Sequence, residues 1–142
     1  MPLPTAGEIA GNIGRSPTNR QKMAIVNHGG KPALTRYRVR KAFGEAAALV
    51  ECRLATGRTH QIRVHMAEAG HPLIGDPVYG RVSAARRRAL PAAIRDEVCG
   101  FSRQALHAYL IGFVHPRTHE WHSYESPLAH DINALISMLE VI

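Results

Sequence analysis

The sequence predicts an α+β domain dominated by antiparallel sheet. Two neighbouring segments, 35–43 and 47–55, alternate apolar and polar residues, which is the pattern of half-buried strands. Apolar residues recur at helical spacing in 60–69 and again from Pro127 onward. The chain has no internal repeat and no apolar run of membrane-spanning length. Its 142 residues suffice for one domain with a core of its own.

The N-terminal region is irregular. Residues 1–22 are rich in Gly, Pro, Asn and Arg without periodicity, and we expect a basic loop or an extended arm there. A short strand is expected at 23–26. It is followed at 27–32 by a turn, because two glycines permit positive φ and Pro32 stops regular structure.

The strand predicted over 35–43 has a basic face and an apolar face. The basic face carries Arg36, Arg38 and Arg40. The other face carries Tyr37, Val39 and Phe43. Gly44 and Glu45 predict a hairpin turn into the next strand, 47–55. Pairing of these strands would place Glu51 opposite one of the arginines.

A helix is expected over 60–69, with Thr59 as its N-cap and Gly70 as its left-handed stop. The tight turn at 75–77 places the carboxylate of Asp76 within reach of nearby backbone N–H groups.

The C-terminal half contains three further units. Short helices are expected on either side of Pro91. The segment 106–114 is predicted to pair as a hairpin with 120–124. From Pro127 the chain is predicted to be helical, with one apolar stripe. The stripe consists of Leu128, Ile132, Leu135, Ile136 and Leu139.

The charge indicates an anionic partner. The formal net charge is +7 and the pI is about 10.1. Most of the basic residues are arginines, whose planar guanidinium matches phosphate oxygens. A domain that binds nucleic acid would have this composition. A soluble domain without an RNA or DNA partner, from an arginine-rich proteome, would have it as well. The segment 81–100 is the least regular part of the chain, and it carries a dense basic cluster of Arg86, Arg87 and Arg88.

The cellular setting is predicted to be the cytoplasm. Cys52 and Cys99 are too few for a disulfide framework and fit buried positions in a reducing compartment. The first residues lack the basic and apolar regions of a secretory signal.

No metal site is expected at the histidines His60, His65 and His71. The first two are five residues apart, which places them roughly 140° apart around a helix. We expect these histidines to donate hydrogen bonds to the backbone or to RNA. Phosphate-binding glycine loops and serine nucleophile motifs are also absent from the sequence.

The segment 56–80, TGRTHQIRVHMAEAGHPLIGDPVYG, is the most informative part of the chain. It holds two arginines, three histidines and two glycine-bounded turns, a mixture that core packing does not require. Arg63 lies beside the apolar stripe of the predicted helix. Such an arginine either covers the core edge with its stem or holds a carboxylate or phosphate with its guanidinium.

This segment resembles the signature of the RluA/RluD-type pseudouridine synthases. The matching stretches are TGRTHQIRVHM at 56–66 and GHPLIGDPVYG at 70–80. Flanking matches are GKPA at 30–33, RQALHA at 103–108 and SPL at 126–128. The resemblance runs from about Gly7 onward. It implies that residues 1–142 form the C-terminal part of such a catalytic domain.

The resemblance implies an enzyme that modifies uridines in RNA, chiefly in large-subunit ribosomal RNA. These enzymes detach uracil from ribose and rejoin it through carbon, with no cofactor or metal. The uridine is flipped out of its stack, and an ionised aspartate is the catalytic residue.

The resemblance also implies roles for individual residues. Arg63 would be the partner of the catalytic aspartate, and Ile62 would lie near the floor of the site. Arg58 and His60 would lie near the site or the RNA backbone. Asp76 and Tyr79 would be architectural.

The chain departs from the family in one respect. The motif H-R-L-D-x-x-T-S-G, which carries the catalytic aspartate, is absent, and the only aspartates are Asp76, Asp96 and Asp131. We therefore expect the chain alone to be inactive, and to self-associate through exposed strand edges. A non-catalytic RNA-binding module and a basic domain without an RNA role remain alternatives. Such a module would bind RNA through the predicted strand arginines and the 86–88 cluster.

Overall fold

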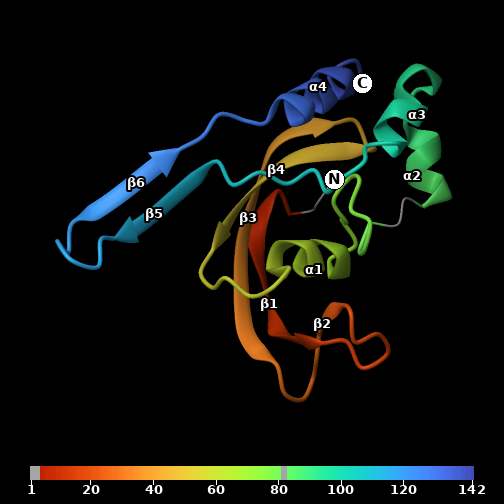
Figure 1. The fold of residues 1–142 in the computed structure, drawn as a ribbon. Coiled ribbons are helices and arrows are strands. Elements are labelled where there is room, and N and C mark those ends of the chain that lie inside the picture. Colours follow the sequence, from red (N-terminus) through yellow and green to blue (C-terminus); the bar gives the residue numbers. More distant parts are fainter. Residues whose placement is uncertain (1–3, 81–82) are drawn as a thin grey trace.

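The computed structural model describes residues 4–80 and 83–142, and it confirms the α+β class. Its larger sheet is antiparallel throughout and has the strand order β2-β1-β3-β4 (Figure 1). The four strands are β1 (Ala6–Arg15), β2 (Met23–Ile25), β3 (Lys31–Phe43) and β4 (Ala47–Leu54). The predicted strands at 23–26, 35–43 and 47–55 are therefore confirmed. However, β3 already begins at Lys31, so the expectation that Pro32 stops regular structure is wrong.

The loop or arm expected over residues 1–22 is wrong for most of its length. Strand β1 occupies the interior of the sheet, between β2 and β3. Its glycines make room for large side chains of the neighbouring strands rather than for turns. A Cβ on Gly7 would lie 3.0 Å from the Tyr37 hydroxyl, and one on Gly11 would lie 3.0 Å from the Ile25 side chain. Residues 1–3 lie outside the described residues.

The β3–β4 hairpin contains a bulge at Arg40. Val39 pairs with Val50 and Lys41 pairs with Leu49, so Arg40 is an extra residue of β3 without a partner in β4. A bulge reverses the alternation beyond it. The predicted placement of Phe43 on the same face as Val39 is therefore wrong. The reversal turns the Phe43 side chain into the hydrophobic core.

Helix α1 (Gln61–Glu68) packs against β1, β2 and β3 and ends as predicted. Gly70 has a φ of 80° and donates its N–H to the Ala67 carbonyl, while the N–H of His71 reaches Met66. These two bonds satisfy carbonyls at the helix end, and only glycine adopts this φ without cost. The polypeptide then turns toward the segment that carries Asp76.

Two helices, α3 (Ala92–Cys99) and α4 (His130–Leu139), pack on the tip of the β3–β4 hairpin, and a short helix, α2 (Ala84–Ala89), precedes α3. Helices α2 and α3 flank Pro91 as predicted, and α4 lies beside α3 (Figure 1). Helix α4 begins at His130 rather than at Pro127, so Leu128 of the predicted stripe lies before the helix. Ile132, Leu135 and Leu139 of the stripe are each 6% exposed or less. The core cluster consists of Phe43, Leu90, Ile94, Val98, Leu135 and Leu139.

The second sheet is a two-stranded hairpin that extends away from the rest of the fold (Figure 1). It is formed by β5 (Leu110–Val114) and β6 (Trp121–Glu125), and we call residues 110–125 the arm. The hairpin was predicted, but its first strand begins at Leu110 rather than at 106. Among the described residues, no helix combines the length and the hydropathy required to cross a bilayer.

Candidate functional site

Gln61 ties the loop that precedes α1 to the sheet. Its Oε1 accepts hydrogen bonds from the Thr56 hydroxyl at 2.8 Å and from the Arg58 N–H at 2.9 Å. Its Nε2 donates to the Leu34 carbonyl and to the Thr35 hydroxyl, both at 3.0 Å. Gln61 is 3% exposed, so these bonds form in a buried environment where an unpaired amide would be costly. These bonds fix residues 56–66, the first half of the family signature, against β3.

His65 extends this network inward. Its Nδ1 lies 2.9 Å from the hydroxyl oxygen of Thr35, and both residues are fully buried. That oxygen also accepts a hydrogen bond from Nε2 of Gln61, whereas Nε2 of His65 has no partner within the described residues. Burial lowers the pKa of His65, which favours the neutral ring. His65 therefore has a structural role, and its Nδ1 is bound to a side chain rather than to the backbone or RNA as predicted.

The helix begins differently from the prediction. His60, not Thr59, is the N-cap residue, and its φ of 56° and ψ of 20° lie in the left-handed region. This conformation costs a non-glycine residue of the order of 1 kcal/mol. The side chain of His60 makes no capping bond, and its Nδ1 lies 3.0 Å from the Tyr79 hydroxyl. Burial, and secondarily the charge of Arg63, lower the pKa of His60.

Arg63 forms a buried two-point ion pair with Asp76. Its Nε donates to Oδ2 and its Nη2 donates to Oδ1, each at 2.8 Å. The side chain of Asp76 is fully buried and that of Arg63 is 10% exposed. Of the two uses open to this arginine, the structure shows the paired guanidinium. The partner of the Arg63 guanidinium is Asp76, which was predicted only to stabilise a turn.

Asp76 also fixes the turn that follows it. Its Oδ1 accepts the N–H groups of Val78 at 2.9 Å and Tyr79 at 3.0 Å, as the turn pattern predicted. Burial raises the pKa of Asp76, but the bonds from Arg63 and from these two N–H groups outweigh burial and lower the pKa to about 2. The carboxylate is therefore ionised at neutral pH and provides Arg63 with a permanent counterion.

Tyr79 anchors the motif to the N-terminal strands. Its hydroxyl accepts the N–H of Met23 at 2.9 Å and lies 3.0 Å from His60 Nδ1. The guanidinium carbon of Arg63 lies 4.9 Å from the centre of the Tyr79 ring, within cation–π range. Lys22 donates to the carbonyl of Val78 at 3.0 Å. We call His60, Arg63, Asp76 and Tyr79 the Arg63 cluster.

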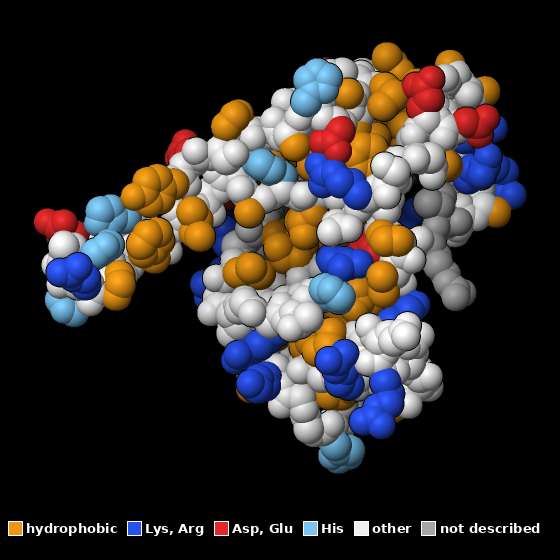
Figure 2. Space-filling model, viewed as in Figure 1, with side chains coloured by type: hydrophobic (Ala, Val, Ile, Leu, Met, Phe, Trp, Pro, Cys, Tyr) orange, Lys and Arg blue, Asp and Glu red, His pale blue; other side chains and the backbone are white. Residues whose placement is uncertain are grey.

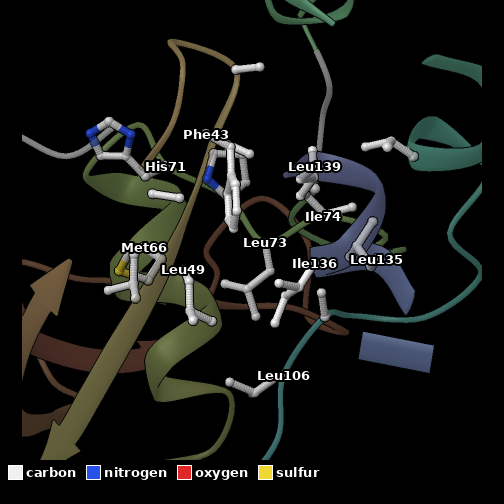
Figure 3. A pocket seen from close by; sticks show the side chains of 18 of the residues that line it. Phe43, Leu49, Met66, His71, Leu73, Ile74, Leu106, Leu135, Ile136 and Leu139 are labelled. Atoms are coloured by element: carbon white, nitrogen blue, oxygen red, sulfur yellow. The ribbon is translucent and has the colours of Figure 1, made fainter. Parts of the chain in front are cut away.

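Ile62 lies on a different side of α1 from Arg63. It lines an apolar cavity of about 210 Å³ between α1, the β3–β4 hairpin, the segment 71–74 and α4 (Figure 3). Adjacent helical residues point about 100° apart, so the cavity and the Arg63 cluster occupy different sides of the helix. The structure therefore does not bring Ile62 and the Arg63 guanidinium into one polar pocket.

The basic residues predicted to bind RNA occupy separate surfaces. Arg36, Arg38 and Arg40 are exposed, and Arg36 and Arg40 pair with glutamates. Because β-strand side chains alternate, Arg36 faces away from Thr35 and hence away from α1. Arg58 precedes α1 and donates to the Pro32 carbonyl at 3.1 Å. The sheet arginines and the Arg63 cluster thus lie on opposite faces of the sheet.

Helix α2 carries the second predicted basic group. Arg86 donates to the Gly70 carbonyl at the end of α1, and Arg87 pairs with Asp96. Arg88 makes no ion pair within the part of the chain that the structure describes. A shallow hollow beside the Arg63 cluster brings Arg86 together with Lys22 and Tyr79. The position of Lys22 beside Tyr79 could not be predicted from the sequence, because it depends on the path of β1 and β2.

Comparison with known proteins identifies what the chain is similar to. The family profile "RNA pseudouridylate synthase" matches residues 1–68. "Ribosomal large subunit pseudouridine synthase D" of Neisseria meningitidis serogroup A is 48% identical over 140 residues, which are 98% of this chain and 36% of the relative. The protein of the same name from Zymomonas mobilis is 45% identical over 136 residues, covering 95% of this chain and 41% of the relative. The chain thus spans well under half the length of these relatives.

A solved structure agrees with these sequence matches. The human protein "RNA Pseudouridylate Synthase Domain Containing 1" superposes on the whole chain with a TM-score of 0.65 and 26% identity, and 62% of that protein is covered. The family profile and the relatives, which are 45–48% identical over nearly the whole of this chain, support the RluA/RluD-type family of pseudouridine synthases.

Proposed function

We propose that this chain forms part of the catalytic domain of an RNA pseudouridine synthase that acts on large-subunit ribosomal RNA. The names of its relatives support this reaction and this substrate. The observation that carries the proposal is the Arg63 cluster, in which the family signature builds a buried, oriented guanidinium. A protein that bound RNA through charge alone would have no need of such a group.

One nitrogen of the Arg63 guanidinium is free to bind a second carboxylate. Nε and Nη2 of Arg63 hold Asp76, whereas Nη1 has no hydrogen-bond partner within residues 4–80 and 83–142. A fixed positive charge beside a second carboxylate would keep that carboxylate ionised against the effect of burial. The family reaction requires an ionised aspartate as its nucleophile. We assign Nη1 of Arg63 to that aspartate.

No aspartate of this chain suits the role of the nucleophile. Asp76 is held by Arg63, and Asp131 accepts two bonds of 2.7 Å from Arg103. Asp96 is exposed and pairs with Arg87 on the surface. We therefore propose that the 142-residue chain alone does not form pseudouridine, and that the nucleophile comes from sequence outside it.

The RNA is proposed to approach the side of the molecule that carries Arg58 and His60. Both lie in the loop that leads into α1, next to Arg63. The hollow formed by Lys22 and Arg86 borders the same cluster and adds two cations for backbone phosphates. The three sheet arginines would be auxiliary, because two of them already have glutamate partners.

A chimeric enzyme tests the function. The matched 140 residues of the Neisseria protein are replaced by the whole of this chain. We expect the chimera to release tritium from C5-labelled, unmodified large-subunit ribosomal RNA, whereas the 142-residue chain alone releases none.

Two results would oppose the proposal. Turnover by the chain alone would show that it contains its own nucleophile. A folded chimera that binds RNA with salt-dependent affinity but lacks turnover would favour the non-catalytic RNA-binding module.

A further inference from the structure

His60 has a backbone conformation that its residue type disfavours. Among the described residues, His60 and one other histidine are the only non-glycine residues with positive φ, whereas five glycines have such a φ. His60 occupies the third position of a tight turn, in which the N–H of Gln61 donates to the Arg58 carbonyl at 2.9 Å. Glycine and asparagine are the residues that suit a positive φ at this position of a turn. The backbone of the turn therefore gives no reason for a histidine here.

The helix that follows gives no reason for a histidine either. The side chain of His60 makes no capping bond to the first N–H groups of α1. Its backbone carbonyl accepts the N–H of Val64 at 2.9 Å, which a glycine at this position could do equally well. A disfavoured conformation persists only where the surrounding contacts require it, and such residues gather at functional sites. The contacts of the imidazole ring are what remains to account for the residue type.

The imidazole ring of His60 contacts Tyr79. Its Nδ1 lies 3.0 Å from the Tyr79 hydroxyl, and the two rings meet edge to face with 5.6 Å between their centroids. The same hydroxyl accepts the N–H of Met23 at 2.9 Å. The hydroxyl end of Tyr79 is therefore held from two sides, by strand β2 and by the residue that begins α1.

Tyr79 in turn covers one face of the Arg63 guanidinium, whose central carbon lies 4.9 Å from the centre of the ring. The two bonds to Asp76 fix the edge formed by Nε and Nη2, but they oppose a tilt about that edge only weakly. A ring packed against the planar face opposes this tilt. Nη1 is the nitrogen that such a tilt displaces most, and a misplacement of about 1 Å at a reacting group can cost about 100-fold in rate.

The charges around His60 indicate that phosphate binding does not depend on it. Burial is the main cause that lowers the pKa of His60, and the charges of Arg63 and Arg15 lower it further, which favours the neutral ring. Figure 2 shows Lys and Arg side chains gathered over the end of the sheet that β1, β2 and β3 form in the lower part of the view. These cations, rather than a neutral imidazole, would attract the RNA backbone.

We propose that His60 is a positioning residue for the reaction: through Tyr79 it holds the Arg63 guanidinium at the tilt that directs Nη1 toward the catalytic carboxylate. The inference rests on the proposed function and on the assignment of Nη1 given there. It accounts for a histidine at a turn position that suits glycine. It also gives Tyr79 a role in the reaction in addition to its anchoring contacts.

Two substitutions at His60 separate the ring from the backbone. His60→Gly removes both the strain and the side chain. His60→Asn also suits a positive φ, and its amide lies near the place of Nδ1, where it can still bond the Tyr79 hydroxyl. In the chimera we expect His60→Gly to lower kcat by about 10- to 100-fold and His60→Asn by less than about threefold. Both should change the Kd for RNA by less than about twofold.

Stability provides the control for these two variants. Because glycine and asparagine both suit the turn, the Tm of the 142-residue chain should differ between them by less than about 4 °C. A purely structural role of His60 would make kcat follow Tm, so that the two variants would have the same kcat. Equal kcat in His60→Gly and His60→Asn would therefore overturn the proposal.

Tyr79→Phe tests the connection between His60 and Arg63. This substitution keeps a ring over the guanidinium but removes the hydroxyl that His60 and Met23 contact. Since His60→Gly and Tyr79→Phe break the same contact, the double variant should have about the kcat of Tyr79→Phe alone. Losses that multiply in the double variant would show that the two residues act independently, which contradicts the proposal.

Hydrogen exchange at Arg63 provides a readout that does not depend on turnover. The Nε–H of Arg63, followed by NMR in the 142-residue chain, should exchange about 10-fold faster in His60→Gly than in His60→Asn. This result together with an inactive chimera would support the positioning role while refuting the proposed activity. Unchanged exchange would refute the positioning role. A loss of RNA affinity as large as the loss of kcat would also overturn it, because it would assign His60 to an RNA contact.

Discussion

Replacing Asp76 by alanine is expected to lower the free energy of unfolding by about 3–5 kcal/mol. The substitution leaves the Arg63 guanidinium, which is 10% exposed, without its counterion. It also removes the acceptor of the Val78 and Tyr79 N–H groups. Urea unfolding of the 142-residue chain, followed by circular dichroism, measures the effect.

Asp96→Ala is the matched control. Asp96 also pairs with an arginine, at 2.9 Å from Arg87, but its side chain is 87% exposed. Exposed pairs contribute little, so the control should change stability by no more than about 0.5–1 kcal/mol. A loss of less than about 1 kcal/mol for Asp76→Ala would show that the buried pair does not hold the motif together.

The same ion pair predicts how stability depends on pH. The pKa of Asp76 in the folded protein is about 2, below its ordinary value of 3.8. A depressed carboxyl pKa stabilises the fold above the unfolded pKa, and this contribution is lost as the pH falls through the folded value. The loss should therefore occur between about pH 4 and pH 2. Asp76→Ala should flatten the pH profile of the unfolding free energy in that window.

The second large effect is expected at Arg63, in the chimeric enzyme. Arg63→Lys should reduce kcat by roughly 100- to 1,000-fold and change the Kd for RNA by less than about twofold. A lysine keeps the positive charge and can still contact Asp76. The single nitrogen of a lysine ammonium cannot make both hydrogen bonds to Asp76. It also leaves no second nitrogen for the catalytic carboxylate. Single-turnover rates and filter binding separate the two quantities.

Arg53→Lys is a suitable control for this experiment. Arg53 also pairs with a carboxylate, Glu51, at 3.0 Å, but it is 79% exposed and lies on the sheet away from the Arg63 cluster. It should alter kcat by less than about twofold. An equal loss of kcat and RNA affinity in Arg63→Lys would mean that Arg63 contacts phosphate rather than the catalytic acid.

Much of the fold could be predicted from local pattern. The period of two in β4 and in β3 as far as Val39, the helical period of α1 and α4, and the stop at Gly70 depend on neighbouring residues, and these predictions were confirmed. Strand β1 could not be recognised, because its glycines are explained only by the cross-strand contacts of Tyr37 and Ile25. The bulge at Arg40 likewise depends on register with β4, which one strand does not reveal.

The site was predictable as a segment but not as a set of contacts. The residue types in 56–80 indicated an anionic partner for Arg63, and the Asp76 turn was evident from its sequence. That these two features meet depends on how α1 and the following turn fold back on each other. The roles of Gln61 and His65 depend on Thr35 in β3, which has no local signal.

The central claim is that Nη1 of Arg63 contacts the catalytic aspartate of a complete enzyme. A crystal structure of the chimera tests it most directly. We predict that Nη1 lies within about 3.2 Å of the carboxylate in the H-R-L-D motif, while Nε and Nη2 remain on Asp76. A separation of more than about 6 Å, with the carboxylate held by another cation, would contradict the claim.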